Sequence, residues 1–179
     1  MLEFYAIMPN RFGGREMLEV YVIVEQKKSI VRKILSILCF VAGAYFMYAS
    51  LLGLIIFFAL AAPLLALGVF LNNRSIEHEY SYFDGDFRFA KIINKQKRKD
   101  LVGYDIENVI IIAPKGDRSL YQYENNPQVK TRDLSSGKKD AKLYVLVAKT
   151  EEDYQMTIFE PDEQYLDAVC IKYRQKVIR

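Results

Sequence analysis

The chain has 179 residues, of which 51% are apolar and 26% charged, and its formal net charge is +3. These averages are ordinary for a soluble domain, but the 40 consecutive residues from Ile34 to Asn73 carry no charge at all. Such a gap excludes a fully soluble cytosolic protein. The remaining residues have a nearly neutral net charge, which excludes a dedicated nucleic-acid-binding protein.

The first 30 residues form a separate N-terminal segment, which we expect in the cytoplasm. Residues 1–16 are either a flexible tail or lie before the true initiator, because Gly13–Glu16 is what a purine-rich ribosome-binding site ahead of Met17 would encode. After them, Leu18–Val24 alternates like a short strand.

The charge-free stretch predicts a transmembrane helical hairpin over residues 31–73. A bilayer core is about 30 Å thick and is crossed by about 20 apolar residues in a helix. We therefore expect helices at Val31–Ala49 and Leu54–Asn72, joined by a tight turn at Ser50–Gly53. The stretch is far too long to be the apolar part of a cleaved signal peptide.

Small residues four apart occur in both predicted helices, at Cys39 and Gly43 and at Ala62 and Ala66. They let helix backbones approach closely. We expect them to pack the hairpin against itself, with assembly into a larger oligomer as the alternative. Between Ile34 and Asn73 neither helix carries a charged side chain, so a pump or transporter is disfavoured.

Lysine and arginine flank the hairpin on one side only. Lys27, Lys28, Arg32 and Lys33 precede or begin the first helix, Arg74 follows the second, and the turn between them has no charge. Cytoplasmic flanks carry the excess of positive charge. Both termini are therefore expected in the cytoplasm.

The remainder, residues 75–179, has the alternation of strands followed by one helix. Asp84-Gly85 between two alternating runs is a strong hairpin signal. Glu160–Glu163, with a proline and three carboxylates, is typical of a helix start. We expect a helix with an apolar stripe after it, and seven strands before it, at residues 76–83, 87–93, 99–104, 109–112, 128–134, 143–148 and 156–159.

Four segments of this region resemble a family of bacterial two-span membrane proteins with a pleckstrin-homology-like (PH-like) cytoplasmic domain. They are Glu79–Phe89, Lys97–Lys99, Ile112–Pro114 and Phe159–Asp162. The resemblance implies an α+β fold: two roughly orthogonal antiparallel sheets forming a seven-stranded sandwich or barrel, capped by the C-terminal helix. It implies no catalytic residues.

The residues offer little catalytic chemistry. The single histidine, His78, is expected on the surface, with pH sensing or catalysis as alternatives. Cys39 and Cys170 cannot make a four-ligand zinc site, and no disulfide is expected between them. Ser135 and Ser136 have no evident histidine partner. We therefore expect no catalytic residue, metal or cofactor.

One charged feature stands out, a set of five cations within nine residues that we call the basic cluster: Lys91, Lys95, Lys97, Arg98 and Lys99. The simpler interpretation is a solvated hairpin tip. The functional interpretation is that the tip rests on an anionic inner leaflet, to which each cation in reach contributes about 1 kcal/mol.

Together these patterns predict a membrane-anchored, cytoplasm-facing binding or scaffolding module without enzymatic activity. Besides the bilayer, its partner is either a protein or anionic lipid headgroups, and not nucleic acid. The alternative is an accessory subunit of a larger membrane complex that acts through its hairpin. An enzyme is the least favoured class.

Overall fold

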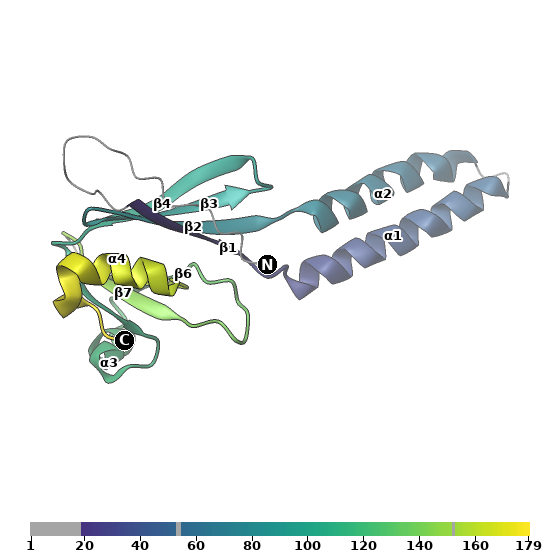
Figure 1. Cartoon of the computed structure of the whole chain (residues 1–179). Coiled ribbons are helices and arrows are strands. Elements are labelled where there is room, and N and C mark those ends of the chain that lie inside the picture. Colours follow the sequence, from purple (N-terminus) through teal and green to yellow (C-terminus); the bar gives the residue numbers. More distant parts are fainter. Residues whose placement is uncertain (1–18, 53–54, 152) are drawn as a thin grey trace. The chain divides into compact units, whose positions relative to one another are not determined.

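The computed structural model describes residues 19–52, 55–151 and 153–179 (Figure 1). The described chain divides into two compact units. Residues 27–75 form one, which we call the helical unit. Residues 19–26 together with 76–179 form the other, which we call the β unit. The questions raised above about residues 1–16 fall outside the described residues.

The helical unit contains two antiparallel helices, α1 (Ile30–Leu51) and α2 (Phe58–Asn73), with a short 3₁₀ turn, η1 (Ile55–Phe57), before α2 (Figure 1). α1 continues through Ser50, so the predicted turn begins later than expected, and part of it lies outside the described residues. Within the described chain, α1 alone is a helix long and apolar enough to cross a membrane. α2 is shorter, because the residues before it form η1.

The seam between the helices is made by small residues. Cys39 and Gly43 of α1 are buried, as predicted, and the Ser36 hydroxyl donates a hydrogen bond of 2.9 Å to the backbone carbonyl of Gly68. A Cβ on Gly43 would lie 2.7 Å from the Leu65 side chain. These contacts allow the two backbones to approach closely.

The second pair of small residues was assigned wrongly to this seam. Ala62 and Ala66 are exposed, whereas Ala61 and Gly68 are the buried residues of α2. A helix turns about 100° per residue, so the four-residue spacing of Ala62 and Ala66 defines a face without saying which neighbour it meets. The buried face of α2 is set by the contacts with α1.

The β unit contains eight described strands in two four-stranded sheets. The first sheet has the order β1-β2-β3-β4 and the second β5-β7-β8-β6. Their bounds are Glu19–Glu25 (β1), Ile76–Phe83 (β2), Asp86–Ile93 (β3), Lys97–Asp105 (β4), Val109–Pro114 (β5), Lys130–Asp133 (β6), Tyr144–Lys149 (β7) and Tyr154–Phe159 (β8).

The sequence predicted β2 to β8 near their observed bounds, and the short strand expected at Leu18–Val24 corresponds to β1. Two corrections follow from the pairing. The strands form two separate sheets and not a single seven-stranded sandwich, and the sheets are not entirely antiparallel, because β6 pairs parallel to β8. Period-two alternation predicts which faces of a strand are buried but not its partner or direction.

The eighth strand, β1, precedes the helical unit in the chain but belongs to the β unit. All seven of its residues pair antiparallel with β2, from Glu19 opposite Phe83 to Glu25 opposite Glu77. The backbone N–H of Gln26 donates to the carbonyl of Ile76 over 2.9 Å. The helical unit is therefore an insertion between two adjacent strands of one sheet, and residues 19–26 belong with 76–179 rather than with a separate N-terminal segment.

Two tight turns connect β2, β3 and β4. Asp84 and Gly85 have φ of 47° and 105°, as the predicted Asp-Gly hairpin requires. Asn94 and Lys95, with φ of 54° and 56°, form the turn between β3 and β4. Both turns keep the pairing continuous, so the alternation of side chains persists from β1 into the start of β4.

The core of the β unit is aromatic and is closed by α4 (Glu163–Tyr173). The Asp162 carboxylate caps this helix by accepting a 2.7 Å hydrogen bond from the Tyr165 N–H, as the predicted helix start requires. The fully buried Tyr165 ring packs against Tyr82 and Phe87 of the first sheet and Phe159 of the second. The Tyr165 ring of α4 therefore contacts both sheets.

The β unit should fold without its insertion, provided that β1 is kept. A chain with residues 27–75 replaced by a turn of about two to four residues should melt cooperatively, because Gln26 and Ile76 are already hydrogen-bonded neighbours. A fragment of residues 76–179 should be less stable by several kcal/mol, since it lacks the buried Val22 and Val24. Thermal unfolding followed by circular dichroism compares the two. Equal melting temperatures would contradict the structural role of β1.

The seam of the helical unit should not tolerate a branched side chain. Gly43→Ile forces the helices apart and should destabilise their packing by about 1–3 kcal/mol, the usual range for overpacking. Ala44→Ile, one residue along on an exposed face, is the matched control and should have little effect. The aggregation temperature of the full chain in detergent reports the difference. Similar values for both variants would argue against this seam.

Candidate basic surface

The basic cluster lies where β3 ends and β4 begins, and strand alternation divides it between two faces. We call inner the face of the first sheet that carries Val22, Tyr80 and Phe89 into the core, and outer the opposite face. Lys91 of β3 and Lys97 and Lys99 of β4 are at inner-face positions. Arg98 is at an outer-face position, and Lys95 is in the turn.

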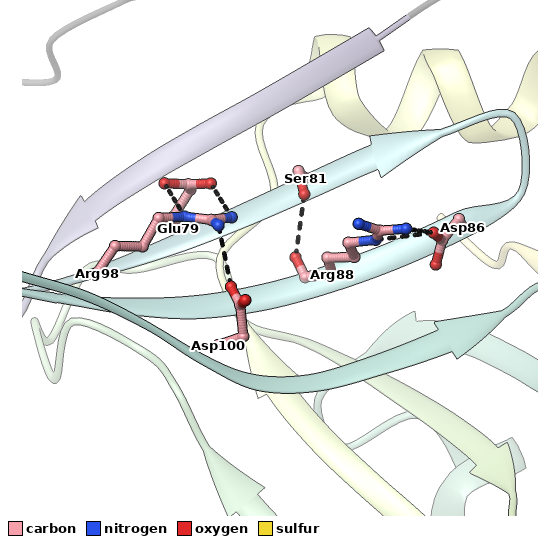
Figure 2. A network of polar contacts seen from close by, with 6 residues as sticks. All are labelled: Glu79, Ser81, Asp86, Arg88, Arg98 and Asp100. Carbon is pink, nitrogen blue, oxygen red and sulfur yellow. Dashed lines mark hydrogen bonds and ion pairs between the residues drawn. The ribbon is translucent and has the colours of Figure 1, made fainter.

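On the outer face, carboxylates neutralise Arg98 (Figure 2). Its guanidinium donates to both carboxylate oxygens of Glu79, at 2.8 and 3.3 Å, and lies 3.0 Å from a carboxylate oxygen of Asp100. The hydrogen bonds that Arg98 donates to Glu79 are the main reason that the pKa of Arg98 is raised. In the turn, the Lys95 ammonium is 3.9 Å from Glu77. Two of the five cations therefore already have anionic partners.

The three inner-face lysines differ from these two. Lys91 lies opposite Lys99 in the register, and Lys97 lies opposite Ile93. Lys97 and Lys99 are exposed and Lys91 is half-buried. No ion pair to a carboxylate is found for any of the three within the described part of the chain. They form a patch of uncompensated positive charge, which we call the inner-face lysines.

The basic cluster is at the end of the sheet from which the chain leaves for the helical unit. Ile76 begins β2 opposite Ile93, which ends β3, and Ile93 lies opposite Lys97, which begins β4. Gln26, just after β1, is hydrogen-bonded to Ile76. Only Arg74 and Ser75 separate α2 from β2, a span of about 7 Å when extended.

His78 lies in the same row of the sheet as two of these lysines. The row consists of Val24, His78, Lys91 and Lys99, one residue from each strand. The prediction that His78 is a surface residue is wrong, because its side chain is only 4% exposed and its Nδ1 has no hydrogen-bond partner among the described residues. β2 contains several polar residues, so its sequence does not show which polar side chain is buried. The burial of His78 depends on the residues that pack against it in the fold.

Burial lowers the pKa of His78, and the nearby Lys91 charge lowers it further. A hydrogen bond to the Leu134 backbone and the charges of Asp133 and Glu160 oppose the shift. The neutral imidazole is therefore the form that the fold favours. This makes His78 a buried neutral member of the row and not an additional cation.

Of the two serines considered for catalysis, Ser136 makes hydrogen bonds within a loop, and the Ser135 N–H donates to the Asp133 carboxylate over 2.9 Å. Ser136 is fully buried, its N–H donates to the Glu160 carboxylate over 2.5 Å, and its hydroxyl accepts from the Lys138 N–H at 3.1 Å. Cys39 and Cys170 are free thiols. Among the described residues, no three histidine, cysteine or acidic side chains come together as metal ligands.

The structure also contains a groove that the sequence did not predict. It has a volume of about 590 Å³ and lies along α4, lined by Asp167, Cys170, Ile171, Arg174, Val177 and Arg179. It forms because the C-terminal segment turns back, so that Val177 bridges to Ile112 of β5. Arg179 and Asp167 form an ion pair at this groove. No local sequence pattern predicts the contact between Ile112 and Val177, which are 65 positions apart.

Comparison with protein families identifies the fold class. Residues 18–179 match the family described as bacterial PH-like domain (DUF6106). The match includes the helical unit as well as both sheets and α4, and the chain belongs to this family. Comparison with curated proteins and with solved structures gave no match.

The buried histidine should make stability depend on pH. Because the pKa of His78 is lowered in the folded state, the unfolded chain takes up a proton first, and the free energy of unfolding should fall as pH drops below about 6.5. The slope cannot exceed about 1.4 kcal/mol per pH unit for one group. Urea unfolding of the full chain in detergent between pH 7 and 5 measures it.

The variant His78→Phe separates this effect from other titrations. It should flatten the pH dependence between 7 and 5, whatever its effect on stability at pH 7, because the chain has no other histidine. An unchanged slope would show that His78 does not cause the loss of stability.

Proposed function

We propose that this PH-like protein is a binding or scaffolding module anchored in the membrane by its helical unit, and that it is not an enzyme. The observation that carries the proposal is an insertion between two paired strands that contains 40 consecutive residues without charge. In α1 only Ser36, Cys39 and Gly43 are buried, and large apolar side chains such as Ile37, Leu38 and Val41 are more than half exposed. Exposed apolar surface of this extent is typical of a site that meets a membrane or a protein partner, and it supports the membrane anchor.

The helical unit has dimensions that suit two crossings. α1 is about 33 Å long at 1.5 Å per residue. α2 is about 24 Å long and, with about 6 Å from η1, reaches the 30 Å of a bilayer core. Tyr45 and Tyr48, both exposed near the connecting end, suit the headgroup region. The positive flanks support an orientation with both termini in the cytoplasm.

The basic cluster supports anionic lipid as one ligand of this module. Its turn is at the end of the sheet joined to the helices by two residues, Arg74 and Ser75. The field of an anionic inner leaflet extends over a Debye length of about 8 Å, so this end is the part of the β unit best placed to meet it. Because Lys95 and Arg98 are paired with carboxylates, we assign the contact to the inner-face lysines.

A second candidate function is that of an accessory subunit acting through its hairpin. It is favoured by the exposed small residues Ala59, Ala62 and Ala66 of α2, which would let another helix approach. Substitution of Ala62 and Ala66 by leucine distinguishes the two. If the protein is a binding module, the double variant should remain active. If it is an accessory subunit, the double variant should be lost from its complex during native purification.

The topology is tested by labelling single cysteines in a chain whose two natural cysteines are replaced by alanine. Ser50→Cys should react with a membrane-impermeant maleimide added outside intact cells, because it lies at the connecting end of α1. Glu107→Cys, in an exposed turn of the β unit, should react only after lysis. The reverse pattern would overturn the orientation, and labelling of both from outside would overturn the membrane anchor.

The assignment to the inner-face lysines predicts an asymmetry within the basic cluster. A soluble chain with residues 27–75 replaced by a short turn should bind vesicles containing phosphatidylserine more strongly than neutral vesicles. The triple variant Lys91→Gln, Lys97→Gln, Lys99→Gln should weaken this binding by about two orders of magnitude if each cation contributes about 1 kcal/mol.

The matched control is the double variant Lys95→Gln, Arg98→Gln. It removes two cations from the same tip, but both have carboxylate partners, so binding should change much less. Sedimentation of the chain with vesicles at low and physiological salt measures the affinities. Equal losses of affinity in both variants would show a general charge effect. Equal binding to neutral and anionic vesicles would show that the chain does not recognise anionic lipid.

A further inference from the structure

His78 has lysines as its neighbours in the first sheet. Lys91 of β3 lies directly opposite it on one side and the uncharged Val24 of β1 on the other, and Lys99 of β4 lies opposite Lys91. The Cβ atoms of directly opposite residues are about 5 Å apart. His78 is buried, Lys91 half-buried and Lys99 exposed, so the row leads from the interior of the β unit to its surface. An anion bound by these lysines at the surface therefore lies close to the buried imidazole.

The carboxylates near His78 come from the second sheet and are already hydrogen-bonded. They belong to Asp133, the last residue of β6, and Glu160, just after β8. Each accepts a backbone N–H from the loop after β6, at 2.9 and 2.5 Å. Both favour the imidazolium form of His78, whereas burial and the charge of Lys91 oppose it. The described residues include no ion pair between these carboxylates and the lysines of the row, so the positive charge of the lysines is not compensated.

The imidazole also has a polar atom that the fold does not use. The side chain of His78 is only 4% exposed, and its Nδ1 has no hydrogen-bond partner among the described residues. Buried polar atoms of native proteins are nearly always hydrogen-bonded, so an unpaired ring nitrogen points to a function for this position. It can take up a proton once the surrounding charge favours the imidazolium.

We propose that protonation of His78 is coupled to the binding of an anionic phosphate group at Lys91 and Lys99, so that the module binds anionic lipid more tightly as the pH falls. This inference rests on the proposed function, because the lipid headgroup supplies the phosphate. A phosphate beside the lysines neutralises the charge that opposes the imidazolium, and Asp133 and Glu160 then stabilise it. By linkage, the imidazolium strengthens the attraction for the phosphate.

The sign of the effect follows from these charges. Without the anion, the pKa of His78 lies below its ordinary value of about 6.5, so the imidazole is neutral near pH 7. A bound phosphate raises this pKa, and binding therefore takes up a proton. A rise of about one pKa unit corresponds to a roughly tenfold tighter binding of phosphate by the protonated form. The affinity increases between the pKa values of the bound and the free protein.

His78 can be titrated directly in the full chain, because it is the single histidine. The chain, without a histidine tag and with an isotope-labelled imidazole, is followed by NMR in nanodiscs of phosphatidylcholine and in nanodiscs that also contain phosphatidylserine. The pKa of His78 should be higher by about one unit in the anionic nanodiscs.

Inorganic phosphate added to the neutral nanodiscs, at an ionic strength matched with chloride, identifies the source of the phosphate group. A similar rise of the pKa would support the site and show that free phosphate also occupies it. A rise in the anionic nanodiscs alone would support the site and assign it to the lipid headgroup.

Two double variants separate a bound phosphate from the general potential of an anionic surface. Lys91→Gln, Lys99→Gln should abolish the difference in pKa between the two kinds of nanodisc. In neutral nanodiscs it should itself raise the pKa, since Lys91 no longer opposes the imidazolium. Lys95→Gln, Arg98→Gln removes as many cations from the same tip and should retain the difference, because both have carboxylate partners.

Two results would overturn the coupling. Equal pKa values of His78 in neutral and anionic nanodiscs would show that no anion affects the row. A rise that persists in Lys91→Gln, Lys99→Gln would reflect the surface potential alone. The proposed function is tested separately by vesicle sedimentation: a chain that prefers anionic vesicles but shows no change at His78 retains the lipid contact and lacks only the coupling, and a chain without that preference lacks both.

Discussion

The pairing of β1 with β2 is the constraint on which the rest of the protein depends. These two strands are adjacent in the sheet but separated in the chain by the whole helical unit, so the sheet holds both ends of the insertion together. The hydrogen bond from Gln26 to Ile76 closes the base of the insertion. Because the loss of β1 would uncover Tyr80 and Tyr82 on the inner face, the same pairing also completes the aromatic core.

This arrangement determines which end of the β unit is connected to the helical unit. The register places the β3–β4 turn beside the points where the chain leaves and re-enters the sheet, so the basic cluster and the two connections share one end. The β3–β4 turn is therefore next to the two connections whatever the angle between the two units. The proposed contact with lipid depends on connectivity and not on a particular orientation.

The five cations of the basic cluster are not equivalent, and the difference comes from alternation combined with local pairing. Arg98 points to the face where Glu79 and Asp100 are within hydrogen-bonding distance, and the inner-face lysines point to the side where His78 is buried and neutral. Charge that is already compensated contributes little to binding another anion. A count of basic residues in the sequence overstates the positive surface of this tip.

The sequence by itself determined the elements whose signal is local. The charge-free stretch, the Asp84-Gly85 turn, the carboxylate cap at Asp162 and the alternation of β2 to β8 depend on neighbouring residues, and each was predicted close to its observed place. The tertiary structure decided what depends on distant partners: the return of β1 to the sheet, the parallel pairing of β6, the burial of His78 and the exposure of Ala62 and Ala66. Periodicity specifies which residues share a face, but a face is buried or exposed only according to what packs on it, and for these residues that partner lies far away in the chain.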